Sequence, residues 1–455
     1  MSDLPEFEAQ GSLTPKELRK IVTASTIGTM VEWYDFFIYA TASSLVFNKL
    51  FFPDLPPLIG ALVAMGTYAA GFVARPIGGL VFGYLGDKFG RKSALVTTLL
   101  IVGIATFVIG LMPTYATIGI AAPLILVFIR LLHGFGVGGE QGNAILICCE
   151  SAPAERRGFY GSWVMMGAPA GFVIPLGLFA LLNLFLSPED FMAWGWRIPF
   201  LLSAVLVGVG LYIRTHLTEP AAFKHAHEGA AVTAQRSPIK AVVKNHFSSV
   251  VWGCCSKLGE STIFSTFAVI VVGYAVSQGI SKQVMINATL IAILIELVTL
   301  PLFGALSDRI GRRPVYLFGA FVCLALSIPA FALVYYKVDT WIWLSLVGIL
   351  AVGHSAMYST MAAFYSELFP TGIRASGVSI IQQFGALFGS VGALGAGWLL
   401  AASGDGAPWY YCIYLVIVLL ITLVGAAKLP ETAPVRRTSK STGNIPVGMF
   451  ANQKA

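Results

Sequence analysis

Long apolar runs dominate this chain, each about 20 residues long and separated from the next by a short polar break. A helix needs about 20 apolar residues to cross a bilayer, and a soluble domain carries roughly 25% charged residues. Here 56% of the residues are hydrophobic and only 11% are charged. The pattern predicts an all-α membrane protein and argues against several soluble domains with buried cores. We expect twelve transmembrane helices, at about 21–47, 58–84, 93–111, 117–148, 159–186, 197–214, 248–278, 284–306, 315–336, 341–366, 375–401 and 408–427.

Lysine and arginine are spread unevenly over the polar breaks. With the N-terminus placed inside, most of the 29 basic residues fall on the inner side. Because basic loops stay cytoplasmic, we expect both termini in the cytoplasm, and the net charge of +7 then reflects topology rather than nucleic acid binding. The polar start predicts a cytosolic tail rather than a signal peptide. Thr14, Pro15 and Glu17 predict a capping box where the first helix begins.

The longest break divides the chain into two halves that repeat one another. We expect a tail at 1–20, a six-helix bundle at 21–214, a linker at 215–247, a second bundle at 248–428 and a tail at 429–455. The stretch at 83–92 recurs at 304–313, and Glu150, Pro153 and Arg157 recur as Glu367, Pro370 and Arg374. Parallel repeats of this kind are a transporter architecture, with the substrate site between the halves near the midplane.

The repeated loop carries the pattern G-x-L-x-D-(K/R)-x-G-R-(K/R), which resembles the signature of the major facilitator superfamily. Further motifs resemble those of its metabolite:proton symporter family, and the resemblance covers about residues 20–430. These motifs are Glu32–Phe36, Arg130–Gly134, Gly138–Glu140, Glu150–Pro153, Trp194–Phe200 and Glu367–Thr371.

That family includes permeases for shikimate, α-ketoglutarate, citrate and proline/betaine. The resemblance implies proton symport in a bacterial cytoplasmic (inner) membrane, with the proton gradient as energy source and no cofactor. It further implies a monomer in the lipid bilayer. Two departures bear on the substrate: His133 stands where the family pattern has glutamine, and Lys257 stands where it has arginine.

Eight ionisable side chains lie well inside predicted spans, and each would cost about 3 kcal/mol facing lipid. They must therefore face one another, backbone or a wet cavity. The eight are Glu32, Asp35, Arg75, Arg130, Glu140, Lys257, Glu260 and Glu296. The acids outnumber the bases, so at least one acid is a candidate proton carrier. Glu32 and Asp35 share a helix face and are our predicted proton-coupling pair, unless one of them is held by Arg130 as a structural pair.

Candidate substrate contacts lie on three spans. Arg130 can bind a carboxylate in a bidentate manner or can neutralise Glu32 or Asp35. By the repeat, Lys257 and Glu260 stand where Glu32 and Asp35 stand in the first half. We predict that Lys257 contacts the substrate anion, the alternative being a pair with Glu260. The predicted substrate-binding set is Arg130, Lys257, Glu260, His133, Gln141 and Tyr34. For Arg75 a structural or gating role is favoured, and for His354 a place in the core.

The repeated cytoplasmic motifs predict an inner gate. Asp87 and Arg91 can bond across helix ends, Glu150 and Arg157 can complete the cluster, and the second half repeats the arrangement. The predicted gating set is Asp87, Arg91, Glu150, Arg157, Asp308, Arg312, Glu367 and Arg374. The alternative is that these loops only anchor the inside.

The sequence favours transport over catalysis. It contains no HExxH, no GxSxG-centred triad and no Cys/His spacing for a metal, so an enzyme is not expected. We predict import of a small organic acid such as a shikimate-like, aromatic, dicarboxylate or tricarboxylate metabolite, driven by the proton gradient. The alternatives are a symporter of a zwitterionic osmolyte such as proline or betaine, or an antiport exporter.

Overall fold

The computed structural model describes residues 14–55, 57–215, 238–403 and 406–434, and these residues form helices and loops with no strand among them. The predicted 1–20 tail before residue 14, the linker at 216–237 and the tail from 435 onward lie outside the described residues. The long helices of the first half are α1 Pro15–Ala42, α3 Pro57–Phe89, α4 Arg91–Leu111, α6 Ala121–Ser151, α7 Arg157–Phe185 and α9 Arg197–Thr215. Those of the second half are α12 Phe247–Ser265, α14 Lys282–Ile310, α15 Arg312–Tyr335, α17 Ser355–Ser366, α18 Arg374–Leu394 and α20 Trp409–Lys428.

Within the described residues, each of the twelve predicted spans coincides with one of these helices and its short extensions, which confirms the predicted fold class. Eight helical stretches are long and apolar enough to cross a membrane, or nine if the bent pair Pro188–Gly195 and Arg197–Tyr212 counts as one span. Some of the long helices also carry polar side chains. Glu32 lies on α1, Arg75 on α3 and Gln382 on α18.

Helix starts follow the local sequence. The hydroxyl of Thr14 accepts the backbone N–H of Glu17 (3.3 Å), and the Glu17 carboxylate accepts the backbone N–H of Thr14 (2.9 Å), so the predicted capping box is confirmed. The repeated loops also match: α4 starts after Gly90 (φ 99°) and α15 after Gly311 (φ 109°). Only glycine adopts such φ values without strain, which explains the glycine in both copies of the motif.

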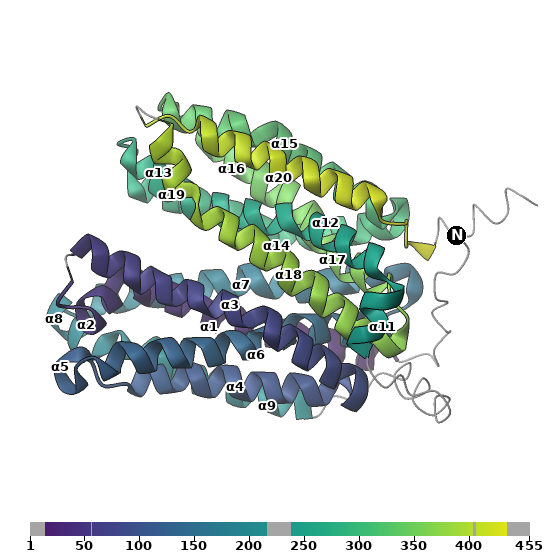
Figure 1. Cartoon of the computed structure of the whole chain (residues 1–455), viewed down its shortest axis with the longest axis horizontal. Helices are drawn as coiled ribbons and strands as arrows, with labels where there is room; N and C mark the ends of the chain where they lie inside the picture. The colour runs from purple at the N-terminus through teal and green to yellow at the C-terminus, as the bar shows by residue number, and fades with distance from the viewer. Residues whose placement is uncertain (1–13, 56, 216–237, 404–405, 435–455) are drawn as a thin grey trace, which may run out of the picture.

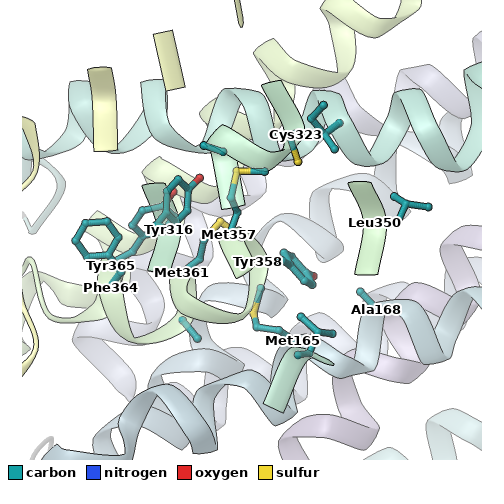
Figure 2. Close-up of a cluster of buried hydrophobic side chains, with 14 of the residues drawn as sticks. Met165, Ala168, Tyr316, Cys323, Leu350, Met357, Tyr358, Met361, Phe364 and Tyr365 are labelled. Carbon is teal, nitrogen blue, oxygen red and sulfur yellow. The ribbon is translucent and has the colours of Figure 1, made fainter. Parts of the chain in front are cut away.

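The two halves lie one above the other, with the first half below and the second above (Figure 1). Across the boundary α7 packs on α14 and α17, and α3 packs on α18. The two halves lie close together at the end of the bundle where α11 (Pro238–Asn245) lies (Figure 1). A large apolar core joins the halves: Met165 and Ala168 of α7 lie in one cluster with Met357 of α17, as Figure 2 shows.

Four predicted spans are less regular than expected. The seventh contains a π-helical segment at Thr266–Ile270, the tenth contains another at Gly348–His354, and the eleventh is divided between α18 and α19 (Ala396–Ala402). A π segment differs from an α-helix by one step in the hydrogen-bond register, which leaves the hydropathy pattern unchanged. The first span likewise continues through a π segment at Ser43–Phe47.

Candidate functional site

At the end of the bundle that carries the repeated loops, which we call the inner end because it is predicted to face the cytoplasm, two aspartates bind helix starts of the opposite half. The Asp87 carboxylate, on α3, accepts the backbone N–H groups of Ala375 (3.0 Å) and Ser376 (2.8 Å) at the start of α18. In the same way, Asp308 on α14 accepts those of Gly158 (2.9 Å) and Phe159 (2.8 Å) at the start of α7. Because a helix N-terminus carries unsatisfied donors and partial positive charge, each aspartate stabilises the contact between the halves.

Charged side chains surround these contacts. The Glu150 carboxylate accepts hydrogen bonds from the guanidinium groups of Arg374 of the other half (2.8 Å) and of Arg91 (3.4 Å). Arg91 is also 3.5 Å from Asp87 and donates to the carbonyl of Thr371 (2.9 Å) in the second half.

The second copy of the cluster has the same composition. Arg312 contacts Asp308 (2.5 Å) and Glu367 (3.4 Å). Arg157 donates its Nε to the carbonyl of Cys149 (3.1 Å) and lies within electrostatic reach of Glu367. The sequence predicts Glu150 and Arg157 in one cluster, and the structure adds an ion pair between Glu150 and Arg374, because the motifs of the two halves meet at the boundary between them.

All eight predicted gating residues therefore lie together, buried, at the inner end. Because their ion pairs and hydrogen bonds join the two halves, this end of the bundle is closed in the structure. A role in gating stays a prediction, which the following experiment addresses.

Replacing Asp87 by alanine is expected to loosen the inner end. Two hydrogen bonds from α18 to a charged acceptor are lost, each contributing about 1.5–3 kcal/mol. Ser379 lies just beyond the gate, with its side chain against α3 and α6. In a protein whose six native cysteines are replaced by serine, a cysteine at position 379 should label about tenfold faster with a thiol reagent once Asp87 is alanine. Glu155→Ala, which removes an exposed acid of a neighbouring loop, is the control. Equal labelling in both variants would leave this motif with a topological role only.

A cavity lies between the halves. Its walls come from α1, α3, α6 and α7 of the first half and from α12, α17, α18 and the adjoining π segments of the second. An aromatic part contains Trp33, Phe36, Phe37, Phe72 and Phe264. A polar part contains Arg75, Gln141, Lys257, Glu260, His354, Tyr358, Gln382 and Gln383. This combination of apolar walls and a few convergent polar groups is typical of small-molecule sites.

The second half contributes a connected set of polar side chains. The Lys257 ammonium contacts the Glu260 carboxylate one turn along α12. In this conformation Lys257 therefore forms the pair with Glu260 that the sequence offered as the alternative to a substrate contact. The other oxygen of Glu260 is 3.2 Å from Nε2 of His354, and Nδ1 of His354 is 2.6 Å from Glu296 on α14. The ring of Tyr358 stacks on His354 (5.2 Å between centroids). The Tyr358 hydroxyl accepts a hydrogen bond from the side-chain amide of Gln141 (3.0 Å).

The first half contributes a separate cluster around Arg130. Its guanidinium contacts Nδ1 of His133 (3.1 Å) and lies over the ring of Tyr39 (4.3 Å). The buried Asp35 carboxylate lies within reach of Arg130 and Thr106. Arg130, His133 and Asp35 do not line the cavity, but Phe36 does, and its ring lies 5.0 Å from Arg130 and 4.5 Å from Arg75. One aromatic ring thus connects the two regions.

The predicted substrate-binding residues fall into two groups. Lys257, Glu260 and Gln141 line the cavity, whereas Arg130, His133 and Tyr34 do not. The Tyr34 hydroxyl donates to the carbonyl of Pro199 (2.9 Å). Glu32, of the predicted proton-coupling pair, is buried and does not line the cavity either.

Several cavity residues were not among the predicted binding residues, and three of them are Arg75, His354 and Gln382. Arg75 stands twelve residues before Asp87, which is about 18 Å along a helix, so its depth could have been read from the sequence. His354 was expected in the core, and only the tertiary structure brings it to Glu260. Gln382 lies in a mostly apolar span, and the sequence leaves open which side of that helix faces the cavity.

Comparison with known proteins decides the family. A family model for sugar and other transporters matches residues 20–249, and the major facilitator superfamily model matches residues 253–454. The chain belongs to the major facilitator superfamily. It is 38% identical to an inner membrane metabolite transport protein of Escherichia coli, which covers 89% of this chain and 93% of the relative.

Two further relatives of this superfamily member have substrates in their names. A shikimate transporter of Escherichia coli is 34% identical, with 84% of this chain and 87% of the relative covered. A proline/betaine transporter of Salmonella typhimurium is 35% identical, with 94% and 87% covered. These relatives confirm a metabolite:proton symporter of the superfamily, and a transporter rather than an enzyme.

Solved structures agree on the fold. The proton:xylose symporter XylE bound to 6-bromo-6-deoxy-D-glucose has a TM-score of 0.72 at 17% identity, with 92% of this chain and 97% of that chain covered. The inward open conformation of the xylose transporter XylE from E. coli gives 0.65 at 18% identity, with the same coverage.

Proposed function

We propose that this protein imports a small organic acid together with protons, by alternating access of its two six-helix halves. The observation that carries the proposal is a cavity between the halves that holds Arg75 and Lys257 while the inner end is closed. Two basic groups on opposite walls suit a carboxylate, and the aromatic part suits a ring or aliphatic body. We further propose a bacterial inner membrane as the location, with both termini in the cytoplasm.

A zwitterionic osmolyte is the second candidate, favoured by the proline/betaine relatives and by the aromatic walls. Rings of this kind bind quaternary ammonium groups. In this chain, however, the Arg75 guanidinium already lies over two of them, 4.5 Å from Phe36 and 4.8 Å from Phe72. A cation at these two rings would therefore meet a positive charge, which favours the acid.

Uptake of labelled shikimate, α-ketoglutarate, protocatechuate and betaine into proteoliposomes tests the proposal. An inward-directed proton gradient should drive accumulation of at least one carboxylate, and a protonophore should abolish it. Accumulation of betaine with no accumulation of a carboxylate would overturn the proposed substrate class and favour the zwitterion.

Gln382 favours a hydroxylated acid within that class. Its side chain is 1% exposed and lines the cavity, and neither its amide oxygen nor its amide nitrogen has a hydrogen-bond partner within the described part of the chain. A buried amide without a partner costs about 1–3 kcal/mol, so a ligand hydroxyl that satisfies it would bind more tightly.

Gln382→Leu is therefore expected to raise KM for a hydroxylated carboxylate about three- to tenfold, since one neutral hydrogen bond contributes about 0.5–1.5 kcal/mol. Uptake kinetics of shikimate and α-ketoglutarate, which lacks a hydroxyl, measure the effect. The matched control Gln283→Leu changes an exposed glutamine at the outer end of α14. An equal rise in KM for both acids would show that Gln382 does not read hydroxyl groups.

A further inference from the structure

Four buried side chains form a continuous line from the cavity wall into the second half. Lys257, Glu260 and His354 line the cavity, and Glu296 lies behind them, with no exposed surface. They come from α12, from the π segment that ends at His354, and from α14. Such π segments are frequent at functional sites, because they turn a side chain away from its ordinary helical direction.

His354 is held between two carboxylates. Its Nε2 lies 3.2 Å from Glu260, and its Nδ1 lies 2.6 Å from Glu296. A neutral imidazole has one N–H and can donate to one of them only. For both contacts to be hydrogen bonds, the three groups must share one further proton, carried either by the ring or by a carboxyl group. The second oxygen, Oε2, of Glu296 has no hydrogen-bond partner among the described residues.

Other titratable groups face this line from each packed element. Tyr358 of α17 stacks on His354, and its hydroxyl is held by Gln141. On α15, Tyr316 lies within electrostatic reach of Glu260, and Cys323 within reach of Glu260 and Glu296. Arg75 of α3 faces Lys257, and Glu32 of α1 faces Tyr358.

The line is neutral only with that shared proton. Two carboxylates are then balanced by the lysine and one proton, and without the proton one negative charge is left in a site where each side chain is at most 4% exposed. An uncompensated buried charge costs several kcal/mol. Binding of a carboxylate substrate at Lys257 is therefore unfavourable while the line is deprotonated, and it becomes favourable once the line has bound the proton.

We propose that His354 and Glu296 together bind one exchangeable proton, and that this proton binds cooperatively with a carboxylate substrate at Lys257. The inference rests on the proposed import of an organic anion. The proton comes from water in the cavity and returns to it when the site opens inward, and no other bond is made or broken. Linkage makes the effect reciprocal: the proton raises the affinity for the carboxylate, and the carboxylate raises the affinity for the proton.

This site is distinct from the predicted proton site at Asp35, so the experiment removes Asp35 first. Purified Asp35→Asn protein is mixed with shikimate, α-ketoglutarate or protocatechuate in weakly buffered solution with a pH indicator, over a range of pH. Proton uptake per bound carboxylate should persist in this variant. It should be lost in Asp35→Asn with Glu296→Gln, because the line is then neutral with an uncharged histidine and needs no proton.

The affinity for the carboxylate gives an independent measure. In Asp35→Asn the affinity for the carboxylate should fall by up to about tenfold for each pH unit above the pH at which the proposed site loses its proton. In the double variant the affinity should stay constant with pH. Asp35→Asn with Glu140→Gln is the matched control, since Glu140 is a buried acid of the first half, bonded to Thr98 (2.7 Å), that does not line the cavity. Glu296→Leu, which removes the same acid, replaces Glu296→Gln should the latter fail to fold.

Loss of all proton uptake in Asp35→Asn alone would overturn the inference, as would unchanged uptake after Glu296→Gln. Binding of betaine, which brings no net charge, should cause no uptake through this site. A wild-type protein that binds none of the three carboxylates would instead contradict the proposed function, so the two failures are distinguishable.

Discussion

Asp35→Asn is expected to abolish uphill transport while leaving exchange of substrate across the membrane. Asparagine resembles a carboxyl group that never releases its proton, so the cycle can no longer return without substrate. Each coupled proton lets a gradient of one pH unit support about tenfold accumulation, and in the variant, which can only exchange substrate, the internal concentration should only reach the external one. Proteoliposomes with an imposed proton gradient measure this loss, and counterflow without a gradient measures the exchange.

Asp54→Asn is the matched control, since Asp54 is an exposed aspartate of the outer loop between α2 (Asn48–Phe51) and α3. Its accumulation should equal that of the wild-type protein. Full uphill transport by Asp35→Asn would rule Asp35 out as the proton site. Glu32→Gln would then be the next variant to measure, because Glu32 shares the helix face.

The helices could be predicted from the sequence because the bilayer imposes one length and one composition on each span. The repeated loop was equally informative: Gly90 and Gly311 both adopt a positive φ, and Asp87 and Asp308 both bind a helix start. The turn at each glycine depends only on neighbouring residues, whereas each aspartate binds a helix start of the other half. Local physics therefore fixed where the helices begin and end.

The partners across the boundary between the halves could not be predicted. The sequence placed Glu150 and Arg157 in one cluster of charges, but it did not show that Glu150 forms an ion pair with Arg374 of the other half, at 2.8 Å. The repeat itself holds the explanation. When two similar halves meet about an axis, a residue of one motif comes close to the second copy rather than to its own neighbours. Pattern analysis of one half at a time cannot show this.

The cavity shows the same limit for buried charges. The cost of burial indicated that Lys257, Glu260 and Glu296 must be compensated, and the sequence offered Glu260 as the alternative partner of Lys257, but it did not identify a partner for Glu296. His354, which lies on another span and after a π segment, completes the set by contacting both carboxylates. That arrangement depends on a one-residue change of register, which leaves no trace in hydropathy.

Lys257→Gln is expected to raise KM for a carboxylate substrate tenfold or more, since a hydrogen bond to a charged group contributes about 1.5–3 kcal/mol. In the structure the ammonium contacts Glu260, and its place on the cavity wall lets an arriving carboxylate compete for it. Lys257→Arg should recover part of the affinity and change the preference among acids, because a planar fork and a point charge favour different geometries. Initial rates of uptake of each acid, normalised to the amount of folded protein, measure both effects.

A structural role for Lys257 predicts a different outcome. Removing the lysine alone leaves Glu260 without its cation, and an uncompensated buried charge lowers stability by about 3–5 kcal/mol. If that were the whole effect, Lys257→Gln with Glu260→Gln would restore both the folded protein and the transport rate. If Lys257 binds the substrate, the double variant regains stability but keeps the raised KM, because no ammonium is left for the carboxylate. Thermal stability and KM measured on the same preparations therefore separate the two roles, and a wild-type KM in the double variant would exclude contact between Lys257 and the substrate.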